Sequence, residues 1–254
     1  MGVSGRVAVV TGAASGQGRA TSLQLAGEGA LVAALDVDTV GLAGLVDELS
    51  DTGARCRAYQ VDVSDSEAVL RAFAEIEADL GRAYVLAAAA AIYPPGTLSH
   101  LRDPEQTARI FDVNLMGVVH CASAATSQMI EEGHGGRIVL WSSIGAGAAI
   151  AGHAAYCAGK AAIEGLGRAL AAELGPYGIT VNTIAPGAID TPMLGTPPDP
   201  AYFEVLPAGR AGTPEEVAHL VSYLCSDSSG FMTGAVLALD GGLSGVNGAV
   251  RPEV

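Results

Sequence analysis

Short apolar runs alternate along the chain with longer segments in which apolar residues recur every three or four positions. The short runs are typical of buried strands, and the longer periodic segments are typical of helices that bury one face. The predicted strands span residues 6–10, 30–35, 55–60, 84–90, 136–141, 179–184 and 235–239. Helices are predicted over residues 39–50, 64–80, 113–132, 154–174 and 213–225. Two more are predicted, one that ends at residue 27 and one that starts near residue 104. Strict alternation predicts an α/β fold: a doubly wound, parallel, seven-stranded, Rossmann-like sheet with helices on both faces.

Nothing in the sequence divides the chain into parts. Its 254 residues contain no internal repeat and no linker, so we expect a single domain covering residues 1–254. The longest interruption of the pattern is residues 190–212, which hold five prolines. This segment predicts a mobile loop with a short helix near residues 201–206.

A glycine-rich segment joins the first predicted strand to the first helix. It reads Thr11-Gly12-Ala13-Ala14-Ser15-Gly16-Gln17-Gly18. Glycines allow a tight turn and a close approach of the backbone to a ligand, and the free N–H groups at a helix start attract phosphate. The spacing alone is weak evidence, but its place between a strand and a helix favours phosphate binding over a bare turn. The predicted phosphate-binding residues are Gly12, Ser15, Gly16, Gln17 and Gly18.

Two carboxylates stand at the ends of the next strands. Asp36 ends the second strand, where it can accept both hydroxyls of an adenosine ribose and would repel a 2′-phosphate. No Lys or Arg lies between Gly12 and Gly18 to attract such a phosphate. We therefore expect NAD rather than NADP, although Asp36 could instead cap the following helix. Asp62, followed by Val63, ends the third strand; it either holds the adenine amino group or is a polar strand end.

A tyrosine and a lysine one helical turn apart offer acid–base chemistry. In Tyr156-Cys157-Ala158-Gly159-Lys160, the spacing of four places both side chains on one helical face. A free Tyr has a pKa of about 10, and a neighbouring ammonium should lower it. Such a phenol can exchange a proton with an alcohol oxygen near neutral pH. Alone, the pair could equally be two half-exposed side chains.

Charge and composition narrow the partners. There are 13 Lys and Arg residues against 27 Asp and Glu, a net charge of −14, and no basic cluster. Nucleic acid and anionic membranes are therefore not expected as partners. No apolar run approaches the roughly 18 residues that span a bilayer. The 4 Cys and 5 His show no metal-ligand or redox spacing, so we expect no metal and a reducing, cytoplasmic location.

Taken in order, these motifs resemble the short-chain dehydrogenase/reductase family over nearly the whole chain. The cofactor loop is Thr11-Gly12-x3-Gly16-x-Gly18, and Asp240-Gly241-Gly242 matches the closing turn. A further segment, Pro186-Gly187 with Thr191, matches the part that contacts the nicotinamide end. The residues that match the family's catalytic tetrad are Asn114, Ser143, Tyr156 and Lys160. One departure is clear: Ala88-Ala89-Ala90-Ala91 stands where the family usually has Asn-Asn-Ala-Gly, so side-chain hydrogen bonds are lost there while backbone contacts remain.

The resemblance implies hydride transfer between a nicotinamide cofactor and a secondary alcohol or ketone. Tyr156 would act as acid or base, and Lys160 would lower its pKa and bind the nicotinamide ribose. Ser143 would hold the substrate oxygen, and Asn114 would hold a water linking Lys160 to solvent, unless it merely caps a helix. The remaining cofactor contacts implied are Ala89, Ala90, Pro186, Gly187, Ile189 and Thr191. Strand-end loops should line the substrate pocket, through Tyr93, Ile144, Ala146, His153, Ile189, Met193, Leu194, Tyr202 and Phe203.

Three functions remain open at this stage. The first is an NAD-dependent secondary-alcohol dehydrogenase acting on a small apolar or cyclic molecule. The second is a 3-oxoacyl thioester reductase, working on a carrier protein as in fatty-acid or polyketide assembly. The third is a non-catalytic, dinucleotide-sensing binding protein.

Assembly is also suggested by the pattern. The segments 113–132 and 154–174 are apolar or small on nearly every face, so a face that does not cover the sheet should meet a second subunit. Two-fold pairing of these helices would give a dimer. A second contact through strand seven and the tail from Leu243 would give a homotetramer, as the resemblance also implies.

Overall fold

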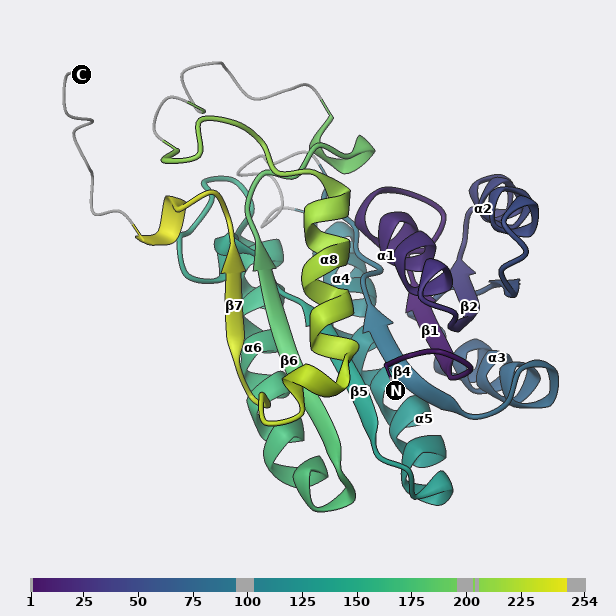
Figure 1. The fold of residues 1–254 in the computed structure, drawn as a ribbon. Coiled ribbons are helices and arrows are strands. Elements are labelled where there is room, and N and C mark those ends of the chain that lie inside the picture. The colour runs from purple at the N-terminus through teal and green to yellow at the C-terminus, as the bar shows by residue number, and fades with distance from the viewer. Residues whose placement is uncertain (1, 95–102, 196–202, 204–205, 246–254) are drawn as a thin grey trace.

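All strands lie parallel in one sheet. The computed structural model describes residues 2–94, 103–195, 203 and 206–245. The sheet has seven strands in the order β3-β2-β1-β4-β5-β6-β7 (Figure 1). Their bounds are β1 Val7–Thr11, β2 Leu31–Asp36, β3 Cys56–Gln60, β4 Ala83–Ala88, β5 Gly136–Trp141, β6 Ile179–Pro186 and β7 Val236–Leu239. The predicted α/β fold is confirmed.

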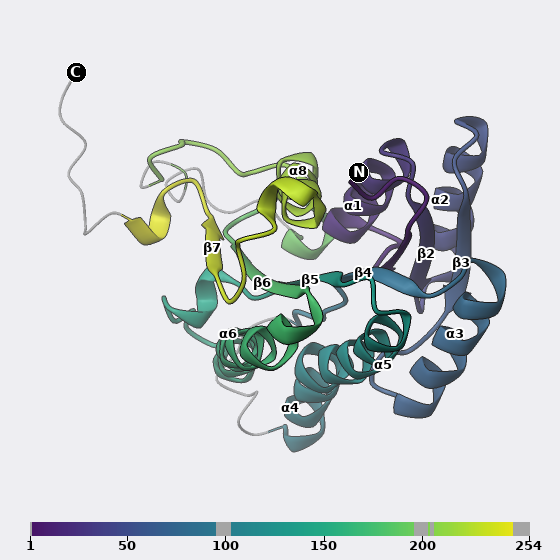
Figure 2. The ribbon, with the colours of Figure 1, turned by 60° about the horizontal axis from the view of Figure 1, so that its bottom comes forward.

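Helices cover both faces of the sheet (Figure 2). Helices α1 (Gly16–Gly27), α2 (Thr39–Asp51) and α8 (Pro214–Cys225) pack on one face. On the other face lie α3 (Ser66–Asp79), α5 (Gly117–Glu132) and α6 (Ala154–Leu174), with α4 (Pro104–Phe111) against α6. Strands β1, β4, β5 and β6 are buried along their whole length and largely apolar, as expected for a parallel sheet covered on both sides.

Short helical turns fill several connections. They are a π-helical turn at Asp112–Met116 and 3₁₀ turns at Ile144–Ala146, Gly175–Tyr177, Pro192–Leu194, Asp227–Ser229 and Leu243–Gly245. The helix expected at 113–132 therefore begins as a π turn that continues from α4. The helix expected at 201–206 falls largely outside the described residues.

Two strand ends differ by two residues from the sequence-based expectation, and the other strand bounds agree within one residue. Strand β4 stops at Ala88 rather than at residue 90, because the chain turns there and the Ala90 N–H donates to Thr11 Oγ1 at 3.0 Å. Strand β6 continues to Pro186 instead of ending at 184. Pro186 pairs with Leu239 of β7, and the next residue, Gly187, donates its N–H to Leu239 O at 3.0 Å.

The segment 190–212 leaves the sheet and returns at one place. Its two ends are joined by a parallel bridge between Ile189 and Gly212. Asp190 N donates to Gly212 O, and Gly212 N donates to Ala188 O, both at 2.9 Å. The base of this predicted loop is thus fixed to the carboxyl end of β6.

Candidate active site

A cavity of about 760 Å³ opens at the carboxyl edge of the sheet, where chain connections from β1 and β4 run to opposite sides. Such a switch point is where open α/β sheets bind ligands. The cavity is lined by every residue predicted to contact the cofactor: Gly12, Ser15, Gly16, Gln17, Gly18, Asp36, Asp62, Val63, Ala89, Ala90, Tyr156, Lys160, Pro186, Gly187, Ile189 and Thr191. The structure therefore brings together residues from distant parts of the chain.

The glycine segment is shaped for close contact with an anion. Gly12 and Gly16 have φ values of +68° and +52°, a region that favours glycine. A Cβ on Gly18 would lie 2.2 Å from Gly12 O, so only glycine lets α1 start this close to β1. The N-cap Ser15 makes no side-chain hydrogen bond to the first turn of α1, and that turn carries no acidic residue. Its N–H groups and positive dipole end fit a diphosphate.

Asp36 lines the cavity at the end of β2. Its Oδ2 accepts the N–H of Ala14, and its Oδ1 accepts the N–H of Asp38, both at 3.0 Å. The cap of α2 is Asp38, which accepts from Val40 and Gly41. The helix-cap alternative for Asp36 is therefore wrong, and its carboxylate stands beside the glycine segment instead.

Asp62 is already engaged by neighbouring side chains. Its Oδ1 accepts from the Ser64 hydroxyl at 2.7 Å, and its Oδ2 forms an ion pair with Arg109 Nη2 at 2.7 Å. Burial alone would raise the pKa of Asp62, but the hydrogen bonds from Ser64 and Arg109 hold it below its ordinary value. Arg109, from α4, also lines the cavity and was not identified from the sequence.

Ser143 and Tyr156 meet at the opposite end of the cavity. Ser143 follows β5, and its Oγ accepts the N–H of Gly145 at 3.1 Å. Tyr156 is 8% exposed on α6. Burial raises the pKa of Tyr156 to about 12, while a hydrogen bond with Ser143 partly offsets this rise. The expectation that Lys160 lowers this pKa is not met here, because desolvation outweighs all other influences.

Lys160 is buried beneath the tyrosine. Its Nζ lies 5.7 Å from the centre of the Tyr156 ring and donates to Trp141 O at 2.8 Å. Loss of water lowers the pKa of Lys160 to about 8. The predicted shared helical face is confirmed, since both side chains face the cavity, but the ammonium is hydrogen-bonded to the strand and not to the phenol.

Asn114 is fully buried and does not line the cavity. It sits in the π turn, and its Oδ1 accepts from Ile92 N at 2.7 Å while its Nδ2 donates to Ile92 O at 2.9 Å. The side chain is thus bound to the chain just before Tyr93, and the helix-cap alternative does not hold. This double hydrogen bond fixes the segment after β4, where the family's usual asparagines are replaced by alanines.

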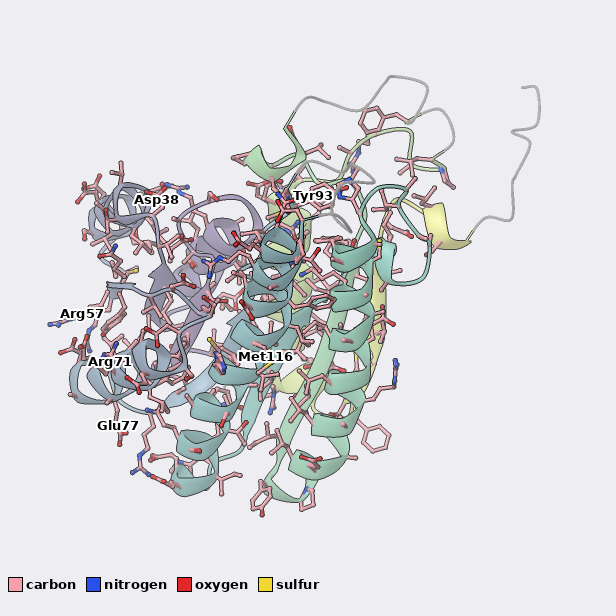
Figure 3. All side chains as sticks on the ribbon, turned by 180° about the vertical axis from the view of Figure 1, so that it is seen from behind. Asp38, Arg57, Arg71, Glu77, Tyr93 and Met116 are labelled. Carbon is pink, nitrogen blue, oxygen red and sulfur yellow. The ribbon has the colours of Figure 1, made fainter. Side chains whose placement is uncertain are left out.

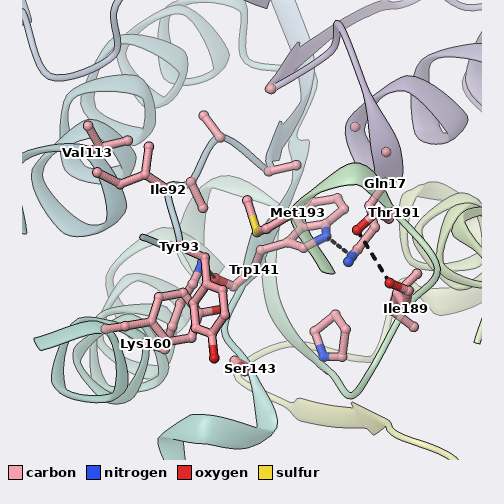
Figure 4. A pocket seen from close by; sticks show the side chains of 18 of the residues that line it. Gln17, Ile92, Tyr93, Val113, Trp141, Ser143, Lys160, Ile189, Thr191 and Met193 are labelled. Atoms are coloured by element: carbon pink, nitrogen blue, oxygen red, sulfur yellow. Dashed lines mark hydrogen bonds between the residues drawn. The ribbon is translucent and has the colours of Figure 1, made fainter. Parts of the chain in front are cut away.

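The remaining walls of the cavity are mostly apolar (Figure 4). Of the predicted substrate residues, Tyr93, Ile144, Ile189, Met193 and Leu194 line it. His153 does not, but its ring stacks on Tyr93 with 4.2 Å between ring centroids. Ala146 and Phe203 lie elsewhere, and Tyr202 is outside the described residues. Lining residues that were not identified from the sequence include Ile92, Arg109, Val113, Trp141, Ile150 and Leu243.

Comparison with known proteins gives the family. A family model described as enoyl-(acyl carrier protein) reductase matches residues 12–244. A hydroxy(phenyl)methylsuccinyl-CoA dehydrogenase subunit of Thauera aromatica is 37% identical over 247 residues, covering 96% of this chain and 98% of the relative. Cis-4-hydroxycyclohexanecarboxylate dehydrogenase of Sinomonas cyclohexanicum is 39% identical over 244 residues, covering 95% and 97%.

A solved structure shares the fold and contains a cofactor. It is a blue fluorescent protein from a metagenomic library in complex with NADPH, 34% identical with a TM-score of 0.89, and the match covers 96% of this chain and 100% of that one. The relatives are named dehydrogenases, and the family binds nicotinamide dinucleotides. On fold, motifs and relatives together, this chain belongs to the short-chain dehydrogenase/reductase family of oxidoreductases.

Proposed function

We propose that the protein is an NAD-dependent oxidoreductase that interconverts a secondary alcohol and a ketone, with an apolar or cyclic substrate. One observation carries the proposal: the buried, hydrogen-bonded pair Ser143 and Tyr156 shares a cavity with the anion-binding start of α1. Measurement of NADH and NADPH consumption with a panel of ketones and acyl thioesters tests it. A protein that binds NADH and turns over none of the panel would instead support the dinucleotide-sensing alternative.

The chain's own groups supply the proton chemistry. A nicotinamide bound in the cavity would accept or supply the hydride. In alcohol oxidation, Tyr156 Oη accepts the hydroxyl proton; in ketone reduction it returns one. Ser143 Oγ donates to the substrate oxygen, where negative charge develops. Lys160, 5.7 Å from the Tyr156 ring, would bind the nicotinamide ribose, and Asn114 fixes the backbone next to Tyr93 through Ile92.

The apolar walls favour a cyclic or apolar substrate. Ile92, Ile144, Ile150 and Met193 surround the space beside Tyr156 without a charged side chain among them. The relative from Sinomonas cyclohexanicum is named for a hydroxycyclohexane substrate. We therefore expect cyclic ketones to be reduced faster than short linear keto acids.

A thioester substrate is the second candidate. The relative from Thauera aromatica is named for a CoA thioester, and the matching family model is named for a carrier-protein substrate. The net charge of −14 argues against docking an acidic carrier protein, but not against a CoA thioester. Faster reduction of a 3-oxoacyl-CoA than of every cyclic ketone in the panel would favour this candidate.

Asp36→Ala is expected to reduce the preference for NAD over NADP. The carboxylate would accept the ribose hydroxyls of NAD and repel a 2′-phosphate, so its loss should shift the ratio of kcat/KM values by about 1–3 kcal/mol. The NADPH-bound family member shows that this fold can also hold the phosphorylated cofactor. Asp38→Ala is the control, because this neighbouring carboxylate caps α2 and does not line the cavity. Wild type that uses NADPH faster than NADH at equal low concentration would contradict the assignment.

We also propose a homotetramer, built first on a pair of α6 helices. Ala161, Ala162 and Gly165 are exposed on α6, whereas Ala122, Ala124, Ala125 and Gly167 face the interior, so α6 offers more of the small-residue surface than α5. Met116, at the start of α5, is 40% exposed on the same side (Figure 3). The edge strand β7 would form the second interface.

Gly165→Arg is therefore expected to break the assembly without unfolding the subunit. A Cβ at Gly165 meets no atom within 4 Å, so the subunit itself tolerates a side chain there. The matched control is Gly44→Arg on α2, which also meets nothing and lies away from this face. Light scattering should report an oligomer smaller than the wild-type tetramer for Gly165→Arg, and the wild-type mass for Gly44→Arg. A wild-type mass of 25.4 kDa at micromolar concentration would contradict the proposal.

The state of the cysteines supports a proposal about the cellular compartment. All four cysteines are free. We propose that the protein works in a reducing compartment such as the cytoplasm. Among the described helices, none has the length and apolarity that a membrane crossing requires.

A further inference from the structure

Trp141 connects the two ends of the site. It is the last residue of β5 and the only tryptophan of the chain. Its carbonyl oxygen accepts a hydrogen bond from Lys160 Nζ at 2.8 Å. Its indole Nε1 donates to Gln17 Oε1 of α1 at 2.9 Å (Figure 4). A single residue thus touches the catalytic lysine with its backbone and the start of the anion-binding helix with its side chain.

The indole determines which way the Gln17 carboxamide faces. An indole N–H can only donate, so it must be met by the oxygen of the carboxamide. The side-chain nitrogen Nε2 of Gln17 then points away from Trp141, and its two N–H groups can donate hydrogen bonds to other partners. Gln17 lines the cavity, and no described residue accepts a hydrogen bond from its Nε2. Those donors are therefore available to a ligand in the cavity.

The cavity has few other groups that can meet an anion at this place. No Lys or Arg lies between Gly12 and Gly18. Among the lining residues that the structure describes, the cations are Lys160, which is bonded to Trp141 O, and Arg109, which is paired with Asp62. A diphosphate at the start of α1 must rely on backbone N–H groups, the helix dipole and neutral side-chain donors.

We propose that Trp141 is a positioning residue that holds the Gln17 carboxamide with its N–H groups toward the diphosphate of the bound dinucleotide. This inference rests on the proposed function, because it takes a nicotinamide dinucleotide as the ligand. It assigns Gln17 a side-chain contact beyond the backbone contacts of the glycine segment. It also links cofactor binding to the strand end that holds Lys160.

Gln17→Glu isolates the two N–H donors. The carboxylate keeps an oxygen for the indole but replaces the donors by a negative charge that faces the diphosphate. ADP-ribose and NADH should each bind at least ten-fold more weakly at low salt, and the loss should shrink as salt screens the repulsion. Adenosine, which has no phosphate, should bind as it does to wild type. Isothermal titration with the three ligands measures this, and Trp141 emission reports NADH binding independently because the indole lines the cavity.

Stability separates this role from a structural one. A carboxylate in the first turn of α1 interacts favourably with the helix dipole, so the Tm of ligand-free Gln17→Glu should equal or exceed that of wild type. Gln24→Glu, with the same charge change on the same helix but outside the cavity, is the matched control and should leave ADP-ribose binding unchanged. Equal binding of ADP-ribose by wild type and Gln17→Glu would overturn the inference.

Trp141→Phe tests the positioning residue itself. It keeps an aromatic ring but removes the donor, so the carboxamide is free to turn. NADH binding, followed by NADH emission, should weaken about three- to ten-fold, the scale of one hydrogen bond. In the Gln17→Glu background, Trp141→Phe should add little further loss, because both changes act on one contact. Full additivity would overturn the inference. Wild type that binds neither NADH nor ADP-ribose would instead overturn the proposed function.

Discussion

Tyr156→Phe is expected to bind NADH as wild type does and to lose at least about 1,000-fold in kcat. Only the phenolic oxygen is removed, and with it the group that exchanges a proton with the substrate oxygen; acid–base catalysis is worth about 100- to 10,000-fold. The ring remains to pack against Tyr93, 4.7 Å away between ring centroids. Steady-state rates with the best ketone of the panel, together with NADH titration, measure both quantities.

Tyr93→Phe is the matched control for this prediction. It deletes a phenol oxygen from the same cavity while leaving Tyr156 and its Ser143 partner in place. Its kcat should stay within about ten-fold of wild type, because a positioning contact is smaller than a proton-transfer group. Substantial turnover by Tyr156→Phe, or an equal loss in both variants, would show that Tyr156 is not the acid–base group.

Lys160→Met is expected to abolish useful activity and to stabilise the fold. Desolvation lowers the pKa of Lys160 from an ordinary value of 10.5 to about 8, which corresponds to about 3 kcal/mol at pH 7. Replacing the ammonium by a side chain of similar length removes that cost. It also leaves Trp141 O without its donor, at about 1 kcal/mol. The net gain of about 2 kcal/mol should raise the Tm by roughly 5 °C at pH 7.

The pH dependence of this gain follows from the sign of the shift. Below pH 8, Lys160 is charged in the folded and the unfolded protein alike, so wild type carries the full desolvation cost. Between pH 8 and 10.5 the folded protein releases the proton first, and the cost fades as pH rises. Thermal unfolding at pH 7 and pH 10 should therefore show a difference between Lys160→Met and wild type that narrows with pH. A lower Tm for Lys160→Met at pH 7 would contradict the burial argument.

Periodicity is sufficient to predict the sheet, because its central strands are buried on both faces and are therefore largely apolar. The residues at which strands end are harder to predict. The sequence Ala88-Ala89-Ala90 is compatible with a strand. In the structure β4 stops at Ala88, because the chain turns there and Ala90 N donates a hydrogen bond to Thr11 Oγ1. That hydrogen bond depends on a residue 79 positions away. No local pattern contains this information.

In the site too, features set by a local motif are predictable, whereas features set by distant residues are not. Residues that a motif defines, such as the glycine segment, lie together at the cavity as the order of strands requires. The sequence places one charged residue next to Tyr156 on its helix, whereas burial by the whole fold raises the pKa of this tyrosine. Arg109 gave no signal, since its partner Asp62 lies 47 positions earlier. Trp141 could be found from the sequence, since it ends a central strand two residues before Ser143 and so lies at the edge of the sheet where ligands bind.

The bridge between Ile189 and Gly212 allows substrate selection and cofactor binding to evolve separately. Because the chain departs from and returns to one fixed point, residues can be exchanged, added or removed between those ends without moving β6 or the cofactor side of the cavity. The entropic cost of a longer insertion grows only slowly with its length. Substrate preference can therefore diverge among relatives by changes within this segment, while the residues predicted to hold the dinucleotide, except Thr191, lie outside it and stay under separate selection.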